Sequence, residues 1–219
     1  MKTVAIVGTN GVPAAYGGFE TLADNLVQQL EGRFRFVVYC SKTPKAKRLA
    51  SYHGAKLIYV PLQANGWQSV FYDLLCTLHA FLTADVILLL GPVFGFVLPL
   101  NVLFRRQLVV NFGGLNEWER EKLTPLQRRY AFLSFKVAAK SATVNVADNR
   151  QLRASMQHSF RKDAVVVRYG GDHAQRLAHS LHHFAHASIL SLGSPISISP
   201  KFSNFKSASR RNIAILVSE

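Results

Sequence analysis

The stretch that decides the fold is Val4-Ala5-Ile6-Val7-Gly8-Thr9-Asn10-Gly11-Val12-Pro13-Ala14-Ala15-Tyr16-Gly17-Gly18-Phe19-Glu20-Thr21-Leu22-Ala23. It joins a short apolar strand to an amphipathic helix through a glycine-rich loop, which is how α/β domains present backbone N–H groups to a phosphate. Its glycines do not fit the G-x-G-x-x-G spacing of dinucleotide sites, and no Gly-Lys-Ser/Thr of a P-loop follows. The Gly-Gly pair indicates a backbone kept free of side chains beside a bulky ligand. The alternative is a plain flexible connection.

The rest of the first 172 residues alternates strands with helices. Strands are expected at 2–7, 34–40, 56–61, 85–90, 107–112, 143–146 and 164–167, and helices at 18–30, 69–82, 94–104, 125–140 and 149–157. Strands that are apolar on both faces and alternate with helices predict an α/β fold, a Rossmann-like doubly wound parallel sheet. Ligands of such sheets bind at the carboxyl ends of the strands.

The end of the second strand disfavours a dehydrogenase. An NAD-binding unit places Asp or Glu there to bind the ribose. Here the sequence reads Val38-Tyr39-Cys40-Ser41-Lys42-Thr43, without a carboxylate. Lys42 could serve NADP, but the dinucleotide fingerprint is also missing.

The net charge of +14 calls for an anionic partner. Without helix-turn-helix, zinc-finger or RNP signatures the sequence predicts no nucleic-acid partner, and it favours an anionic membrane surface or a phosphate-rich ligand. The apolar stretch 84–103 is broken by glycine, proline and polar residues, so it predicts a buried strand and a greasy surface helix rather than a membrane span. That helix ends in Arg105-Arg106, which suits a protein lying on a membrane.

The cysteines and the start of the sequence predict a cytoplasmic protein. Cys40 and Cys76 belong to no disulfide or metal-binding motif, and the first residues do not have the pattern of a secretory signal peptide.

The composition changes after Asp172. Residues 173–219 hold five of the eight histidines and one acidic residue, Glu219. The histidines lack acidic or cysteine companions, so no metal site is predicted. We therefore expect a domain at 1–172 and, at 173–219, a poorly ordered, divergent or truncated start of a second domain.

Three motifs carry a resemblance to a known enzyme family. They are Val-Gly-Thr-Asn-Gly-Val-Pro-Ala-Ala-Tyr-Gly-Gly-Phe-Glu-Thr (7–21), Val-Asn-Phe-Gly-Gly-Leu-Asn-Glu-Trp-Glu-Arg-Glu-Lys (110–122) and Arg-Tyr-Gly-Gly-Asp (168–172). Together with the order of elements they resemble the N-terminal half of a GT-B glycosyltransferase of the retaining family-4 type, and within it rhamnosyltransferase-like proteins of bacterial surface-polysaccharide assembly. The resemblance covers residues 1–172.

The resemblance implies transfer of a sugar from a nucleotide sugar, such as dTDP-rhamnose, to a lipid-linked saccharide at the inner face of the plasma membrane. It implies no metal and no cofactor besides the nucleotide sugar. Glu117 would orient an acceptor hydroxyl as the catalytic residue, or be a solvated carboxylate at a helix start. Trp118 would stack on a sugar or simply pack. The implied sites are Gly17, Gly18 and Glu20 for the donor diphosphate, and Tyr16, Asn111 and Trp118 for the acceptor.

One family feature has no counterpart in the sequence. Family-4 enzymes hold the nucleotide sugar with a Glu-x7-Glu motif in the C-terminal domain, and residues 173–219 contain no carboxylate before Glu219. A frameshifted or prematurely ended gene would produce such a tail. The alternative function is therefore a catalytically inactive, truncated remnant that keeps only the acceptor-binding half. A third is an unrelated basic protein that binds membranes or nucleic acid.

Overall fold

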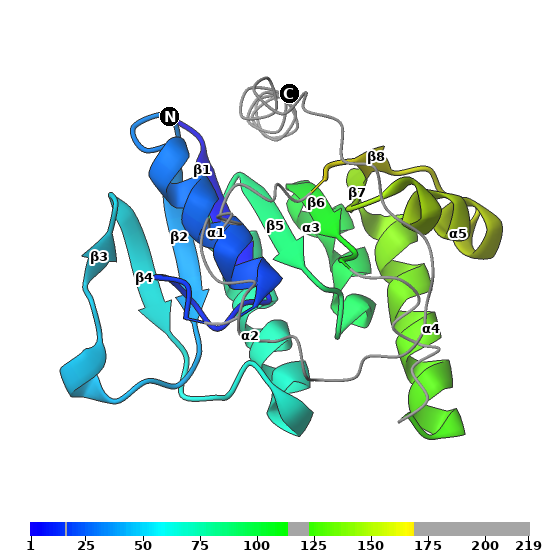
Figure 1. The fold of residues 1–219 in the computed structure, drawn as a ribbon, viewed down its shortest axis with the longest axis horizontal. Helices are drawn as coiled ribbons and strands as arrows, with labels where there is room; N and C mark the ends of the chain where they lie inside the picture. The colour runs from blue at the N-terminus through cyan, green and yellow to red at the C-terminus, as the bar shows by residue number, and fades with distance from the viewer. Residues whose placement is uncertain (16, 114–122, 169–219) are drawn as a thin grey trace, which may run out of the picture.

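A computed structural model describes residues 1–15, 17–113 and 123–168. Its centre is one eight-stranded sheet (Figure 1) in the order β3-β4-β2-β1-β5-β6-β7-β8. Seven strands are parallel to their neighbours, and only β3 runs antiparallel, to β4. The strands are β1 (Thr3–Val7), β2 (Arg35–Cys40), β3 (Ser51–Tyr52), β4 (Ala55–Tyr59), β5 (Val86–Leu90), β6 (Gln107–Asn111), β7 (Val144–Ala147) and β8 (Val165–Val166).

The strand order confirms the predicted fold class. Without β3, the order from β4 to β7 is that of a doubly wound Rossmann-like sheet, in which the chain winds outward from β1 in both directions. The direction reverses between β1 and β5, which is the point where such sheets bind ligands. The predicted tail, 173–219, lies outside the described residues.

Helices cover both faces of the sheet. The helix α1 (Gly18–Gln29) packs on one face, while α2 (Ser69–Thr83), α4 (Pro125–Ser141) and α5 (Arg150–Phe160) pack on the other. Figure 1 shows α1 in front of the sheet. The remaining helical segments are α3 (Asn101–Phe104) and three 3-10 turns, η1 (Lys45–Lys47), η2 (Gly66–Gln68) and η3 (Gly95–Leu100).

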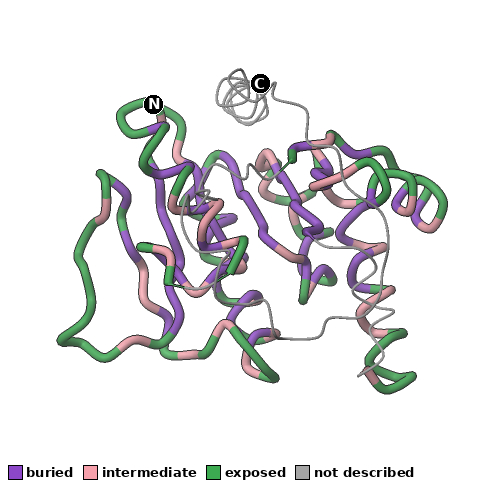
Figure 2. Tube along the Cα trace, in the orientation of Figure 1, coloured by how far each residue is buried: buried purple, intermediate pink, exposed green. Residues whose placement is uncertain are grey.

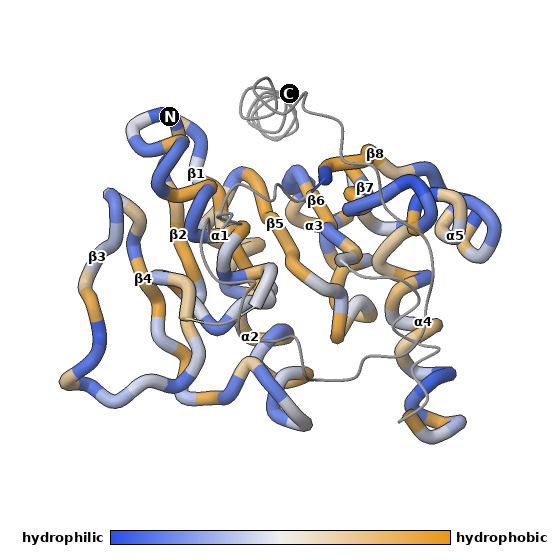
Figure 3. The backbone as a smooth tube through the Cα atoms, in the orientation of Figure 1, coloured by the Kyte–Doolittle hydropathy of each residue, from blue (hydrophilic) through white to orange (hydrophobic). Residues whose placement is uncertain are grey.

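The sequence of β5 is that of a central strand, which is buried on both faces of the sheet. All five of its side chains, Val-Ile-Leu-Leu-Leu, are buried, and alternate ones enter the two different cores. Side chains of a strand alternate between its faces, so only a strand covered on both sides is apolar throughout. The central strands are accordingly purple in Figure 2, and β5 is mostly orange in Figure 3.

The expected helix at 94–104 is the main local difference. The chain instead forms a 3-10 helix, η3, followed by the single turn α3. Pro99 lies inside η3 and has no N–H to donate, so a regular α-helix across it would lose a hydrogen bond. The strand β3 was not predicted from the sequence, because two residues are too few for a recognisable pattern.

Helix caps fix where α4 and α5 begin. Thr124 and Gln127 form a capping box at the start of α4, with Pro125 in its first turn. The Asn149 side chain accepts a hydrogen bond of 2.7 Å from the Leu152 N–H and caps α5. In the part of the chain that the structure describes, no helix combines the length and the apolar character needed to cross a membrane.

Candidate functional site

The glycine-rich loop between β1 and α1 crosses the carboxyl edge of the sheet. Gly8 has φ +89°, and a Cβ there would overlap the carbonyl oxygen of Leu90 at the end of β5. Gly11 has φ +122°, and its Cβ would lie 2.7 Å from the Cys40 sulfur at the end of β2. Both positions need glycine, for the backbone angle and for space. The loop therefore lies tightly against the strand ends on both sides of β1.

Hydrogen bonds fix the first part of the loop. The buried Thr9 accepts the Gly11 N–H on its hydroxyl (3.1 Å) and the Tyr72 hydroxyl of α2 on its carbonyl (3.0 Å). The Asn10 carbonyl accepts the Ser41 N–H, just beyond β2 (3.0 Å). A helix on one face of the sheet and the end of β2 thus hold the first part of the loop.

Two acids of α1 hold the rest of the loop. Glu20 is buried, and its Oε1 accepts the Asn10 backbone N–H (3.1 Å) and the Asn10 side-chain amide (2.8 Å). Asp24 accepts the Ala14 N–H (3.1 Å). The Glu20 carboxylate also occupies the space where Gly17 would carry a Cβ. Glu20 therefore positions the loop from within the first turn of α1.

The helix α1 begins at the exposed residues Gly17 and Gly18. Gly17 is its N-cap with φ +105°, and no side chain of the described residues caps this end. Backbone N–H groups at the start of a helix are unpaired within it, and the helix dipole makes this end attractive to anions. Among the described residues, no atom lies within 4 Å of the position that a Cβ on Gly18 would take.

The aromatic ring of Phe19 anchors this helix end at the switch point of the sheet. A Cβ on Gly113 would lie 2.6 Å from the Phe19 ring, and one on Gly91 would lie 3.1 Å from it. Both glycines follow strand ends, those of β6 and β5. Gly17 and Gly18 are therefore placed beside the point where the strand order reverses. Phe19 lies in the motif 7–21 directly after the Gly-Gly pair, but it was not among the predicted site residues.

Asn111, a predicted acceptor residue, is buried at the end of β6. Its side-chain oxygen accepts the Gly113 N–H (2.9 Å), and its carbonyl accepts the Gly91 N–H (2.9 Å). It therefore joins the ends of β5 and β6 beneath the Phe19 ring.

Polar side chains meet at the ends of β2 and β4. The Ser41 hydroxyl donates to Gln63 (3.3 Å) and accepts the Ala64 N–H (3.2 Å). The Asn65 side-chain amide donates to the Asn10 side-chain oxygen (3.3 Å). A neutral hydroxyl and amides therefore stand where a dinucleotide enzyme has its ribose-binding carboxylate.

A buried carboxyl group, Asp73, lies on α2 next to Tyr72. Burial raises its pKa from 3.8 to about 8, because the ionised form loses its hydration. Its charged form would also raise the pKa of Cys76 and of Tyr130 on α4, so these groups lie near it. The Tyr130 hydroxyl donates to the Val93 carbonyl just beyond β5 (3.1 Å). Asp73 was not a predicted site residue, because a single acid in an apolar helix is normally expected on its exposed side.

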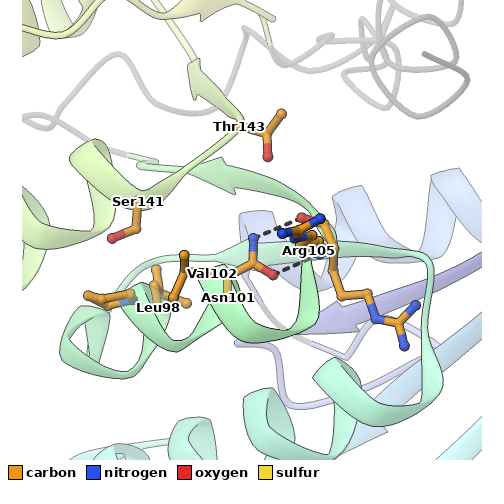
Figure 4. Close-up of a pocket in the computed structure, with 8 residues that line it drawn as sticks. Leu98, Asn101, Val102, Arg105, Ser141 and Thr143 are labelled. Atoms are coloured by element: carbon orange, nitrogen blue, oxygen red, sulfur yellow. Dashed lines mark hydrogen bonds between the residues drawn. The ribbon is translucent and has the colours of Figure 1, made fainter.

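The predicted residues Tyr16, Glu117 and Trp118 lie outside the described part of the chain, as does the histidine-rich segment. The structure thus brings together Gly17, Gly18, Glu20 and Asn111 at one edge. Within the described residues, no group of three or more His, Cys, Asp or Glu side chains could hold a metal ion. A hollow of about 470 Å³ between α3 and the amino ends of β6 and β7 lies at the opposite edge (Figure 4).

Comparison with known proteins identifies the family. The model of a family described as "Domain of unknown function (DUF1972)" matches residues 1–172, and the chain belongs to this family. No curated protein matches the sequence.

Two solved structures show distant similarity to the chain. HepE from Anabaena, in complex with UDP and glucose, is 16% identical with a TM-score of 0.49, over 78% of this chain and 45% of that chain. A short-chain dehydrogenase/reductase from Veillonella parvula, in complex with NADP, is 10% identical with a TM-score of 0.40, over 67% of each chain. The chain thus spans less than half the length of HepE. At such low TM-scores neither similarity assigns a function.

Proposed function

We propose that this protein is part of a glycosyltransferase. It binds a nucleotide sugar at the β1–α1 loop, and the sugar is transferred from the nucleotide to a lipid-linked saccharide. The observation that carries the proposal is the exposed, uncapped N-terminus of α1 at Gly17 and Gly18, held at the switch point of the sheet. Neutral N–H groups and the helix dipole can stabilise a diphosphate leaving group without a metal.

The hydrogen bonds that hold residues 9–14 of the loop support this role. Glu20 and Asp24 bind its backbone from α1, Tyr72 binds it from α2, and Phe19 fixes the start of α1. Donors fixed in advance stabilise developing charge without reorganising during the reaction. The Glu20 carboxylate is itself negative, and its hydrogen bonds with Asn10 keep it directed at the loop. We therefore assign Glu20 to positioning Gly17 and Gly18 beside the donor.

The end of β2 supports a nucleotide sugar over a nicotinamide cofactor. Ser41 and its neutral partner Gln63 occupy this end, and Lys42 follows. A dinucleotide site would have a ribose-binding carboxylate here.

The finer assignments rest on the resemblance of residues 7–21, 110–122 and 168–172 to rhamnosyltransferase-like proteins. On that basis the donor is dTDP-rhamnose, no metal takes part, and the protein works at the inner face of the plasma membrane. Glu117 orients the acceptor hydroxyl, while Trp118 and Tyr16 contact the acceptor and Asn111 supports that site from β6. The donor nucleotide also requires groups from a C-terminal domain.

The test uses a charge placed at the helix start. Gly18→Glu puts a carboxylate where the diphosphate would bind, at a position whose Cβ would meet no described atom and at a helix end that favours acids. We expect it to fold normally and to weaken dTDP-rhamnose binding, measured by calorimetry, by about tenfold or more. Gly18→Ala controls for the loss of glycine. Gln29→Glu adds the same charge at the exposed last residue of α1.

Equal affinities for the Gly18→Glu and Gln29→Glu variants would refute the loop site. Binding that depends on Gly18, without sugar transfer to a lipid-linked acceptor, would support the alternative of an inactive acceptor-binding half. Strong and salt-dependent binding to duplex DNA instead would favour an unrelated basic protein.

A further inference from the structure

The helix α2 is apolar on the side that faces away from the sheet. Phe71, Leu75 and Leu82 are all exposed there, at spacings of four and seven residues that place them along one stripe. Trp67, just before the helix, is 76% exposed and its ring meets that of Phe71 edge-on at 6.3 Å. A helix that is apolar all round is normally buried, so this stripe indicates a surface that is covered in use.

The neighbouring segment η3–α3 continues this surface. It contacts both α2 and α4, and the stacked rings of Phe81 and Phe104 (5.2 Å) join it to α2. Phe96 is exposed beside Tyr130 of α4, with ring centroids 5.5 Å apart. Val102 and Leu103 are 75% and 73% exposed. We call Phe71, Leu75, Leu82, Phe96, Val102 and Leu103 the outer apolar surface.

The exposed charged side chains on α2, η3, α3 and α4 are basic, and one exposed acid, Asp85, lies between α2 and β5. The segments α2, η3, α3 and α4 contain one acid, Asp73, and it is buried. Arg129 and Lys140 are exposed on α4, around the exposed Leu133, and Arg105 is exposed at the end of α3. An excess of exposed bases attracts an anionic surface. A protein partner would need both acidic side chains for these bases and apolar side chains for the stripe.

The hollow at the amino edge adjoins the same surface. Asn101 and Val102 of α3 line one side, and Ser141 and Thr143 line the other (Figure 4). Arg105 and Arg106 also line it. Cationic and hydroxyl groups thus stand directly beside the exposed Val102, an arrangement that suits a phosphate at the boundary between lipid headgroups and acyl chains.

We propose that the outer apolar surface docks the protein on an anionic bilayer, with its apolar side chains in the interface and Arg105, Arg129 and Lys140 against lipid phosphates. An anionic bilayer is the partner that matches this surface, because its phosphates complement the exposed bases and its acyl chains accept the exposed apolar side chains. The proposal rests on the membrane location given in the proposed function and names the surface that reaches the bilayer, which includes neither the β1–α1 loop nor its ligand.

The experiment measures sedimentation of the full chain with vesicles of phosphatidylcholine, with or without roughly one third phosphatidylglycerol. We expect about tenfold stronger binding to the anionic vesicles at low salt, and loss of most of this preference at high salt. Trp67 provides a second readout in the Trp118→Phe variant, where it is the only tryptophan. Its fluorescence should shift to the blue and be quenched by brominated lipids.

Matched variants locate the surface. Leu82→Gln with Val102→Thr should weaken vesicle binding about tenfold, because both side chains leave the interface. The control, Leu49→Gln with Val165→Thr, makes the same changes at exposed positions outside this surface and should change vesicle binding less than about twofold. Arg129→Gln with Lys140→Gln should remove the preference for anionic lipid. Arg35→Gln with Lys56→Gln, on β2 and β4, is its charge-matched control. Circular dichroism checks that each variant is folded.

Three outcomes would overturn the proposal. They are equal weakening by the test and control pairs, equal binding to neutral and anionic vesicles, and absence of vesicle binding. Self-association that Leu82→Gln with Val102→Thr abolishes would show that a second copy covers the surface instead. The two test pairs and their two control pairs should leave nucleotide-sugar affinity without vesicles unchanged. Failure of the loop site and failure of the docking surface are therefore distinguishable.

Discussion

Replacing Asp73 with asparagine should make the stability of the fold less dependent on pH. The carboxyl group is only 4% exposed, on a helix face packed against the core, and burial raises its pKa to about 8. Asparagine has nearly the same shape as the protonated acid and carries no charge at any pH. The substitution therefore removes a titration and leaves the packing almost unchanged.

The sign and size of the effect follow from linkage. The folded pKa of about 8 lies above the ordinary value of 3.8, so between these values the folded protein holds a proton that the unfolded chain has released. The free energy of unfolding then falls as pH rises, by about 1.4 kcal/mol per pH unit. From about pH 5 to about pH 7, the wild type should lose roughly 3 kcal/mol relative to Asp73→Asn.

Urea unfolding followed by circular dichroism at several pH values measures this difference. Subtracting the two proteins cancels the titration of all other groups. Asp163→Asn is the control, since its exposed carboxylate pairs with Arg153 and has a pKa lowered to about 2. Its contribution is lost only as pH falls toward 2, so it should leave the slope at neutral pH unchanged. A stability difference between wild type and Asp73→Asn that stays constant over this range would refute the reasoning.

Two further predictions concern the loop and a helix cap. Gly8→Ala should lower the free energy of unfolding by about 2 kcal/mol or more, because a Cβ at φ +89° overlaps the Leu90 carbonyl, whereas Gly18→Ala should change it by less than about 0.5 kcal/mol. Comparable urea midpoints for the two alanine variants would contradict the close approach of loop and strand. Asn149→Ala removes the acceptor of the Leu152 N–H and should cost about 1 kcal/mol, seen as a lower Tm. An unchanged Tm would show that the cap contributes nothing.

Much of the fold could be predicted from the sequence because one physical requirement produces one visible pattern. A strand buried on both faces must be apolar throughout, and β5 therefore stands out as Val-Ile-Leu-Leu-Leu. The alternation of strands with helices then fixes parallel pairing, and the carboxyl edge follows. The sequence pattern alone therefore places Gly17, Gly18 and Asn111 at this edge.

The remaining features depend on contacts between distant segments. Glu20 looks like an exposed first-turn acid, and only the returning loop gives it Asn10 as a partner. Asp73 interrupts an apolar helix, and nothing in its neighbours along the chain indicates that α2 turns it inward. Pro99 disfavours a regular α-helix over 94–104, but nothing in the local sequence indicates that this segment forms a 3-10 helix packed against α4.

The Phe19 ring has a consequence for how this family can evolve. It fills the space that Cβ atoms would need at Gly91 and Gly113, two positions from different strand ends. Selection on any one of these three positions is therefore linked to the other two, although they are far apart in the gene. Both glycines also have positive φ, +77° at Gly91 and +62° at Gly113, so among homologues we expect a smaller residue at position 19 to accompany only Asn or Asp at 91 or 113. Such correlated changes would mark lineages in which the start of α1 has shifted relative to the ends of β5 and β6.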